Sequence, residues 1–337
     1  MVKAKRYEGL FLLLTMMLII LFVLNIGMGS VNIPFLETCR IISQHLTGSV
    51  PGGIIWKIRM PRVLSTLFCG GYLAVAGLLL QVFFRNPIVG PYVLGISSGA
   101  TLMVALVMLA GLSIGILGIH PFFLSVAAFS GALAVMVVIL VVASRVKNII
   151  TLLIIGLMMG YVCHAITSIL IAFAEKEKVK GFVLWQMGSF SGFTWKEFYL
   201  VLLLGVPLLV GAYLMSKPLN AFLLGEDYAK SMGVNIKAFR FLIVIFSSAL
   251  AGLVTAFAGP VAFIGLAVPH MARLTFGASD NKLLIPGVVL LGAIVTSLCD
   301  LVARTMFSPV ELPVSAITSF FGAPIVIGLL LKRRVAI

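Results

Sequence analysis

The chain has 337 residues, of which 61% are hydrophobic and 10% are charged, and its formal net charge is +14. A soluble globular domain is about half apolar and about one quarter charged, so this composition excludes an ordinary soluble protein. The excess apolar surface must face lipid, and a transmembrane helix needs ~20 apolar residues. The basic residues lie in short connectors between apolar runs, which indicates membrane topology rather than nucleic-acid binding.

The N-terminus resembles a signal peptide, because Lys3, Lys5 and Arg6 precede an apolar run. No small-residue cleavage site follows and many further apolar runs do, so we interpret residues 9–27 as a retained first span. The cysteines form no C-x-x-C pair, which supports neither a disulfide framework nor a zinc site. They stand far apart in the chain, at Cys39, Cys69, Cys163 and Cys299.

Ten apolar segments follow one another along the chain, at about 9–27, 62–84, 92–111, 120–143, 149–173, 198–216, 239–258, 261–276, 283–302 and 320–332. Segments of this length and composition are typical of membrane-spanning helices. The sequence therefore predicts an all-α membrane protein with about ten transmembrane helices in a single transmembrane domain, residues 1–337. Alternation from a cytoplasmic start places both termini in the cytoplasm.

The basic residues test this topology. Of the 24 Lys and Arg residues, fifteen fall on the predicted inner side, including Lys147, Arg333 and Arg334, and nine fall outside. Inner loops of membrane proteins are enriched in positive charge, so the direction of the bias agrees with the topology. The bias is modest because two outer loops are basic, and those outer charges need a separate reason.

A three-residue sequence, the internal echo, occurs in two of the predicted spans. Ala76-Gly77-Leu78 lies in the second span and Ala251-Gly252-Leu253 in the seventh. The second span runs inward and the seventh outward, as an inverted-topology repeat requires.

Four groups of motifs interrupt the apolar pattern. In chain order they are Lys57-Ile58-Arg59-Met60-Pro61-Arg62 with the following 70–81, 85–87 and 94–100 segments; 223–234, from Leu223 to Val234; 259–273, from Gly259 to Arg273; and Asp300-Leu301-Val302-Ala303-Arg304 with Glu311-Leu312-Pro313-Val314. Together they closely resemble the FecCD-like family, the permeases of ABC importers for iron chelates, heme and cobalamin. The resemblance runs from about Arg59 to Lys332, and its four ordered motifs are specific only in combination.

The resemblance implies a ten-helix subunit that pairs with a second permease around a central pathway, here expected as a homodimer. Two ABC ATPase subunits, which hold ATP and Mg, would attach inside, and an extracytoplasmic substrate-binding protein would dock outside. Spans 2–5 and 7–10 would form the inverted repeat. The family motifs also include residues expected to be structural, namely Gln81, Asn86, Pro87, Pro269, His270 and Asp300.

The inner loop at about 217–238 is polar enough to leave the membrane, yet apolar residues recur in it at helical spacing. Gly225 and Gly233 punctuate the loop, which predicts two short helices joined at Gly225. The resemblance implies that these are the helices that couple the permease to its ATPase. It assigns this role to Leu223, Leu224, Gly225, Glu226, Asp227, Ala229, Met232 and Gly233. The alternative is a surface loop that packs only on its own bundle.

Three arginines stand at the predicted outer face, Arg59, Arg62 and Arg304. The resemblance implies that they dock the binding protein, and the guanidinium fork suits carboxylates on such a partner. The alternative is an internal ion pair, for example between Arg304 and Asp300 one helical turn away.

Ionisable residues inside the spans are scarce and include His164, His270 and Asp300. Such residues usually face the protein interior or a water-filled path. The fifth span lines the pathway in the family, so its candidate pathway residues are Met158, Met159, Cys163 and His164. A heme cargo could contact His or Met through its iron; ordinary core packing is the alternative. The aromatic segment 185–195 resembles an outer re-entrant element, or it anchors at the membrane interface.

The chain has no G-x-x-x-x-G-K-[ST] motif, so we expect no ATP hydrolysis by that route. Its sequence supports no Ser/His/Asp triad and no paired intramembrane carboxylates, so we expect no enzyme activity. We also expect no metal or cofactor of its own. The leading interpretation is the permease of an ATP-driven importer in the inner membrane of a bacterium. We rank ferric siderophore before heme and cobalamin as cargo. An ion-coupled secondary transporter would need a protonatable group near the midplane, and a passive channel would need rings of selectivity residues.

Overall fold

The computed structural model describes residues 2–332 apart from 30, 32, 112–120 and 147–148. The predicted inner charges Lys147, Arg333 and Arg334 therefore lie outside the described residues. Every regular element in the described part is helical. The elements are α1 (Val2–Gly27), α2 (Phe35–Ser43), α3 (Val50–Gly53), the π-helix η1 (Ile54–Arg59), α4 (Met60–Phe83), the 3-10 helix η2 (Pro91–Leu94), α5 (Ile96–Met108), α6 (Pro121–Arg145), α7 (Ile149–Phe173), α8 (Lys176–Gln186), α9 (Trp195–Leu214), α10 (Ser216–Leu224), α11 (Glu226–Ser231), α12 (Ile236–Ala258), α13 (Ile264–Phe276), α14 (Asn281–Thr305) and α15 (Val314–Lys332).

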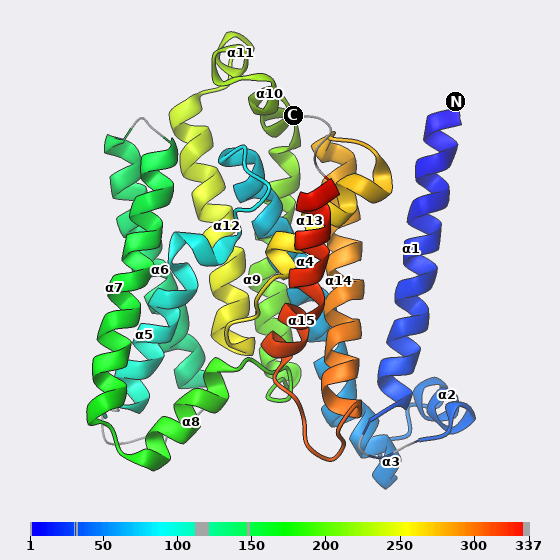
Figure 1. The fold of residues 1–337 in the computed structure, drawn as a ribbon. Helices are drawn as coiled ribbons and strands as arrows, with labels where there is room; N and C mark the ends of the chain where they lie inside the picture. Colours follow the sequence, from blue (N-terminus) through cyan, green and yellow to red (C-terminus); the bar gives the residue numbers. More distant parts are fainter. Residues whose placement is uncertain (1, 30, 32, 112–120, 147–148, 333–337) are drawn as a thin grey trace.

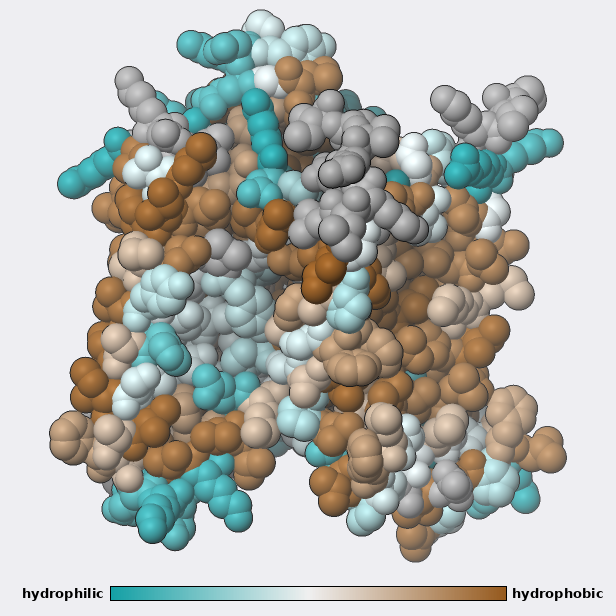
Figure 2. All heavy atoms as spheres, in the orientation of Figure 1, coloured by the Kyte–Doolittle hydropathy of each residue, from teal (hydrophilic) through white to brown (hydrophobic). Residues whose placement is uncertain are grey.

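The helices confirm the all-α membrane fold. Seven described helical stretches are long and apolar enough to cross a membrane: Lys5–Gly27, Val50–Phe83, Phe122–Val142, Ile150–Phe173, Trp195–Leu214, Ile236–Ala258 and Asn281–Thr305. The other three predicted segments correspond to the shorter α5, α13 and α15. Figure 2 shows hydrophilic residues gathered at the two ends of the molecule and a hydrophobic belt between them. The count of ten crossings stays a prediction.

The start of α1, the end of α15 and the short helices α10 and α11 lie at one end of the bundle (Figure 1). Helices α2, α3 and α8 lie at the opposite end. We call the first end inner and the second outer, following the predicted topology, in which the 217–238 loop faces the cytoplasm.

Helix α4 forms the centre of the bundle and is buried over nearly its whole length. It packs against α14, α12, α13 and α9. The contact with α14 is a close backbone approach, because a Cβ atom added to Gly70 would lie 2.4 Å from the carbonyl oxygen of Gly292. Small residues permit such approaches where lipid removes the hydrophobic drive for helix association.

The internal echo has a structural counterpart. A Cβ atom on Gly77 of α4 would meet the Gly265 carbonyl oxygen of α13 at 1.7 Å, and one on Gly252 of α12 would lie 2.8 Å from Cβ of Ala132 in α6. Each glycine of the echo thus permits a helix of the opposite half to approach.

The two short apolar helices, α5 and α13, resemble each other in how they begin. Each follows a Gly-Pro pair, at residues 90–91 and 259–260, and each is preceded by a residue with positive φ, Gly95 (73°) and Phe263 (64°). Helix α5 contacts α6 and α7, as α13 contacts α14 and α15. This correspondence agrees with the predicted inverted repeat of spans 2–5 and 7–10, and it explains why both segments give only short helices.

Candidate functional site

The inner loop contains the predicted pair of short helices. Helix α10 ends at Leu224 and α11 begins at Glu226, so their junction at Gly225 is confirmed. Gly225 has φ 138° and ψ 149°, a backbone conformation that residues other than glycine rarely adopt. Gly233, with φ 84°, follows α11. We call residues 216–233 the coupling unit.

The coupling unit presents apolar side chains at its surface. Leu224 is 70% exposed and Met232 65% exposed, with Leu223 and Tyr228 also exposed, whereas Ala229 is fully buried. Exposed apolar groups are expected along the hydrophobic belt, where lipid covers them. At the inner end, beyond the end of α9, contiguous exposed apolar residues are typical of a surface that another protein covers. Figure 1 shows α11 at the extreme inner end of the molecule.

The opposite side of the coupling unit is firmly packed. Leu219 and Phe222 are fully buried, and the Phe222 ring lies 4.8 Å from the ring of Phe239 in α12. The Glu226 carboxylate accepts two hydrogen bonds from Arg240 of α12, both 2.9 Å. The coupling unit is therefore packed against the bundle on one side and exposed on the other. The packed side is what a loop on its own bundle would show, and the exposed apolar side is what an ATPase contact would need.

The outer arginines are buried together with Asp300, and the exposed Glu311 lies at their edge. We call Arg59, Arg62, Arg304, Asp300 and Glu311 the outer arginine cluster. Arg62 donates from Nη2 to Asp300 Oδ1 at 2.9 Å and from Nη1 to Glu311 Oε1 at 2.8 Å. Arg304 Nε lies 3.7 Å from Asp300 Oδ2. Asp300 is fully buried. Its charge at this depth is offset by the two guanidinium groups, as buried charges require.

Two members of the cluster hold the outer end of α1. Arg59 donates to the carbonyl oxygens of Ile26 and Gly27, at 2.6 and 2.7 Å, and to that of Val31. Arg304 donates to the carbonyl oxygen and side chain of Asn25. The last carbonyls of a helix lack intrahelical partners and carry partial negative charge, so cations are stabilising there. This contact gives the outer positive charges a structural reason.

The docking prediction for these arginines needs correction. A partner must reach the guanidinium groups, yet Arg59, Arg62 and Arg304 are only 4, 6 and 5% exposed. Their donors are also directed at acceptors within the chain. The structure supports the alternative, an internal ion pair, for Arg62 and Arg304, and a helix-capping contact for Arg59. Sequence reasoning missed Asn25; a polar residue near the end of an apolar span is the signal that could have found it.

The predicted pathway residues of α7 separate into two groups. Met158 is 49% exposed and His164 is exposed, and Met159 is half-buried, whereas Cys163 is 4% exposed and belongs to the apolar core. The pathway prediction is therefore wrong for Cys163, because its side chain points into the bundle. The neighbouring Tyr161 is 62% exposed and continues the open face of α7.

A polar hollow of about 210 Å³ lies beside His164. Its other lining residues come from η2, α5, α7, α8 and the start of the segment before α13, namely Tyr92, Ser97, Ser98, Thr101, Thr167, Gln186 and Pro260. Figure 2 shows a hollowed, pale to hydrophilic area within the hydrophobic belt on the side of α7. Polar side chains at membrane depth usually face a water-filled path rather than lipid. This face is the best candidate for a pathway lining.

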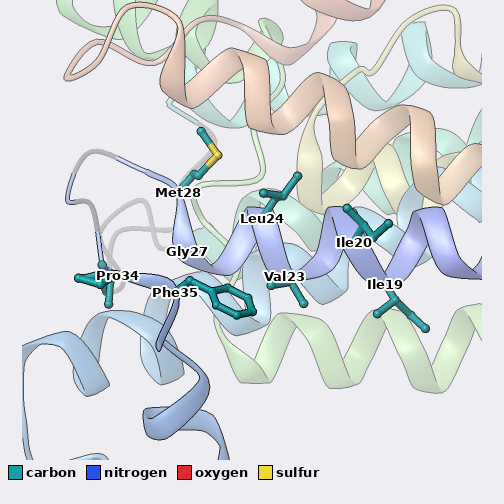
Figure 3. A pocket seen from close by; sticks show the side chains of 9 residues that line it. Ile19, Ile20, Val23, Leu24, Gly27, Met28, Pro34 and Phe35 are labelled. Atoms are coloured by element: carbon teal, nitrogen blue, oxygen red, sulfur yellow. The ribbon is translucent and has the colours of Figure 1, made fainter. Parts of the chain in front are cut away.

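A second hollow, of about 710 Å³, has the opposite character. It lies between the outer half of α1 and the start of α2, and its lining is apolar, including Ile20, Leu24, Met28 and Phe35 (Figure 3). Residues 19–27 belong to a candidate membrane span, so lipid is the surrounding phase. We assign this groove to the lipid-facing surface and not to the pathway.

The predicted structural residues fasten neighbouring segments. Gln81 donates to the Leu266 carbonyl oxygen at 3.0 Å and accepts from Arg273 at 2.7 Å, which joins α4 to α13. Asn86 Oδ1 accepts from the backbone N–H of Ile88 at 3.0 Å, across Pro87. These contacts agree with a structural role for both polar side chains.

The remaining predicted structural residues lie in α13 and α14. Pro269 is buried inside α13 and His270 is half-buried beside it. Asp300 is the centre of the outer arginine cluster.

The outer aromatic segment 185–195 is tied to the bundle. The Ser189 N–H donates to the Ala258 carbonyl oxygen at 2.9 Å, and the Val314 N–H donates to that of Gly188 at 3.2 Å. The Trp195 indole donates to the Trp56 carbonyl oxygen at 2.8 Å. The segment therefore lies against the ends of α12 and α15, beside the polar hollow, which agrees with an element folded back into the outer mouth.

The bundle, with seven described helices long enough to cross a membrane, defines a polytopic membrane protein. The family model of the FecCD transport family matches residues 17–332, and the chain belongs to that family. It is thus the permease subunit of an ABC importer of the FecCD/BtuC type and a multi-pass inner-membrane protein. It is a transport component and not an enzyme, because the ATPase of such importers is a separate subunit.

The chain is similar to proteins of known assignment. It is 36% identical over 278 residues to the vitamin B12 import system permease protein BtuC of Salmonella typhi, covering 82% of this chain and 83% of that protein, and equally similar to BtuC of Salmonella newport. A solved structure reported as an inward-facing conformation of a metal-chelate type ABC transporter matches with a TM-score of 0.84 and 28% identity, covering 96% of this chain and 99% of the other.

Proposed function

We propose that this chain forms the membrane pathway of an ATP-driven importer that carries an iron chelate, a ferric siderophore or heme, across the cytoplasmic membrane. The observation that carries the ATP-driven part is the coupling unit, whose exposed apolar side chains lie outside the candidate membrane spans. Its buried side is packed on α12, so a partner bound there acts on the bundle through a fixed element.

Each proposed partner is assigned to one surface: the coupling unit, the exposed face of α7 or the outer end. Two ATPase subunits, each with its ATP and Mg, would cover the coupling units of two permease copies. The exposed face of α7, which includes Met158 and Tyr161, is where a second copy of this chain would enclose the pathway. A binding protein would deliver cargo at the outer end. Because the arginine cluster is buried, we expect docking to use other outer side chains, such as the exposed Arg40 and Lys57.

Cobalamin is a second candidate cargo. The specific observation in its favour is the 36% identity to BtuC over most of the chain. Ferric siderophores, heme and cobalamin are all bulky metal chelates with polar edges, and the hydroxyl, amide and imidazole groups of the polar hollow suit such edges in general.

Leu224→Glu tests the proposed ATPase contact. The charge replaces a 70% exposed apolar group, so the fold is expected to persist while the ATPase dissociates from the purified permease. The matched control is Leu36→Glu, at an 83% exposed leucine of the outer end, which should leave the ATPase bound. Retention of the ATPase by Leu224→Glu at the wild-type level would contradict the proposal.

Gly225→Trp tests the joint between the two short helices. Because φ is 138° at this residue, a side chain strains the backbone and moves α11 relative to α10. We expect uptake into vesicles to fail while ATP hydrolysis continues. Normal uptake by this variant would exclude a coupling role for the joint.

The cargo is identified by binding and uptake together. The cognate binding protein is titrated with a ferric siderophore, heme and cobalamin, and each ligand that binds is tested for ATP-dependent uptake by vesicles containing the full transporter. Uptake of a ferric siderophore or heme alone supports the first choice, and uptake of cobalamin alone replaces it. In a separate heme titration of the purified transporter, identical absorption spectra for the wild type and His164→Ala would remove the heme-ligand role of His164.

A further inference from the structure

Besides the Glu226–Arg240 contact, two polar contacts join the coupling unit to the bundle, and neither Arg85 nor Asn220 is among the residues assigned to coupling from the sequence. The first involves Arg85, which follows α4 and has φ 46°. Its Nη2 donates to the Phe222 carbonyl oxygen at 3.0 Å, and its guanidinium carbon lies 5.0 Å from the centre of the Phe222 ring. Phe222 belongs to the last turn of α10, where the partial negative charge of the helix end favours a cation. The contact therefore attaches the end of α10 to the inner end of α4.

The second contact involves Asn220, two residues earlier in α10. Its Nδ2 donates to Asp280 Oδ1 at 2.6 Å, and its Oδ1 accepts from the backbone and side chain of Asn281, both at 2.8 Å. Asp280 also caps the start of α14 by accepting from the Lys282 N–H. Asn281 is fully buried, whereas Asp280 is exposed, so this contact lies at the edge of the core. It attaches the same short helix to the first turn of α14.

One contact is made with each half of the inverted repeat. Helix α4 opens the first half and α14 belongs to the second. Along the middle of the bundle these two helices are in close backbone contact at Gly70 and Gly292. A displacement of α10 therefore reaches α4 and α14 at their inner ends, as well as α12.

We propose that Arg85 and Asn220 are positioning residues that transmit movement of the coupling unit to α4 and α14. This inference rests on the proposed function, because it presumes an ATPase that moves α10. A short helix attached at one point only can pivot, whereas one attached at two points moves with both helices. Loss of either contact is expected to reduce cargo movement per ATP without removing the ATPase from its binding surface.

The experiment uses the full transporter, with permease, ATPase and binding protein, in vesicles. The variants are Arg85→Gln, Asn220→Ala and their combination, and the readout is cargo molecules taken up per ATP hydrolysed. We expect each single variant to lower that ratio at least about fivefold, the lower end of couplings between distinct sites. Arg85→Lys keeps a cation and a donor and should restore the ratio. Lys237→Gln, at an exposed cation of the same inner end, should not change it.

The ratio separates transmission from simple loss of protein, because it is independent of how much complex folds. An unchanged ratio in the combined variant overturns the inference, even if total uptake falls. So does failure of Arg85→Lys to restore the ratio. If instead the wild-type permease retains no ATPase, the proposed function fails and this inference fails with it, so the two failures are distinguishable.

Discussion

The outer arginine cluster and the inner coupling unit interrupt the same apolar pattern in opposite ways. At the outer end, charged side chains are buried: Arg62 and Arg304 surround Asp300. At the inner end, apolar side chains are exposed, with Leu224 and Met232 both more than half accessible. Each arrangement is unfavourable unless something compensates. In the outer arginine cluster, the buried charges are paired with groups of the same chain. In the coupling unit, the exposed apolar side chains need a second protein to cover them.

This comparison predicts different consequences for mutation. Changes in the outer cluster should remove folded protein, because they leave buried charges without partners. Changes on the open side of the coupling unit should remove transport from a protein that still folds. The three predictions below address the outer end, from the largest expected effect to the smallest, and each can contradict the comparison.

Asp300→Ala is expected to have the largest effect. The substitution leaves Arg62 and Arg304 buried without their shared carboxylate, and breaking a buried ion pair in this way costs about 3–5 kcal/mol. The measurements are the yield of folded permease and its thermal midpoint in detergent. Glu311→Gln is the control, since its 42% exposed side chain can still hydrogen-bond to Arg62 and should lose less. Wild-type stability in Asp300→Ala would show that the cluster is not structural.

Arg59→Gln is expected to have an intermediate effect. It removes donors from the carbonyl oxygens of Ile26 and Gly27, and leaving buried groups unsatisfied costs about 1–3 kcal/mol. Hydrogen exchange should accelerate at the outer end of α1, while the inner end and ATPase binding stay unchanged.

Arg40→Gln, at an exposed arginine of α2, is the matched control for the exchange measurement on Arg59→Gln, and not for binding-protein association. It should leave exchange in α1 unaltered. If Arg59→Gln instead weakened binding-protein association and left α1 protected, the docking interpretation of Arg59 would return.

Lys178→Gln is expected to have the smallest effect. Its ion pair with Glu175 joins side chains that are 39 and 71% exposed. Exposed pairs contribute about 0–1 kcal/mol and are screened by salt, so the thermal midpoint should not change measurably. A clear loss of stability, persisting at high salt, would mean that exposed outer charges matter as much as the buried cluster.

The short helices α5 and α13 show how much of the structure the hydropathy pattern could predict. Hydropathy located both segments within a few residues, yet it predicted ordinary spans, at 92–111 and 261–276. The described helices cover only Ile96–Met108 and Ile264–Phe276. In each segment the chain first passes through a Gly-Pro pair and a residue with positive φ. Such non-helical backbone is tolerated at membrane depth only where protein encloses it or where it lines a water-filled cavity, and a hydropathy window detects neither condition.

The sequence by itself determined the membrane fold, the family and the two-helix coupling unit. These follow from apolar runs, from ordered motifs and from the position of Gly225, all of which are local in the chain. The tertiary structure decided where the charges and the core side chains point. Arg62 meets Asp300 across 238 residues, Arg304 meets Asn25 across 279, and Cys163 turns into the core one residue from the exposed His164. Pairings at such separations depend on which helices become neighbours, and only the assembled bundle fixes that.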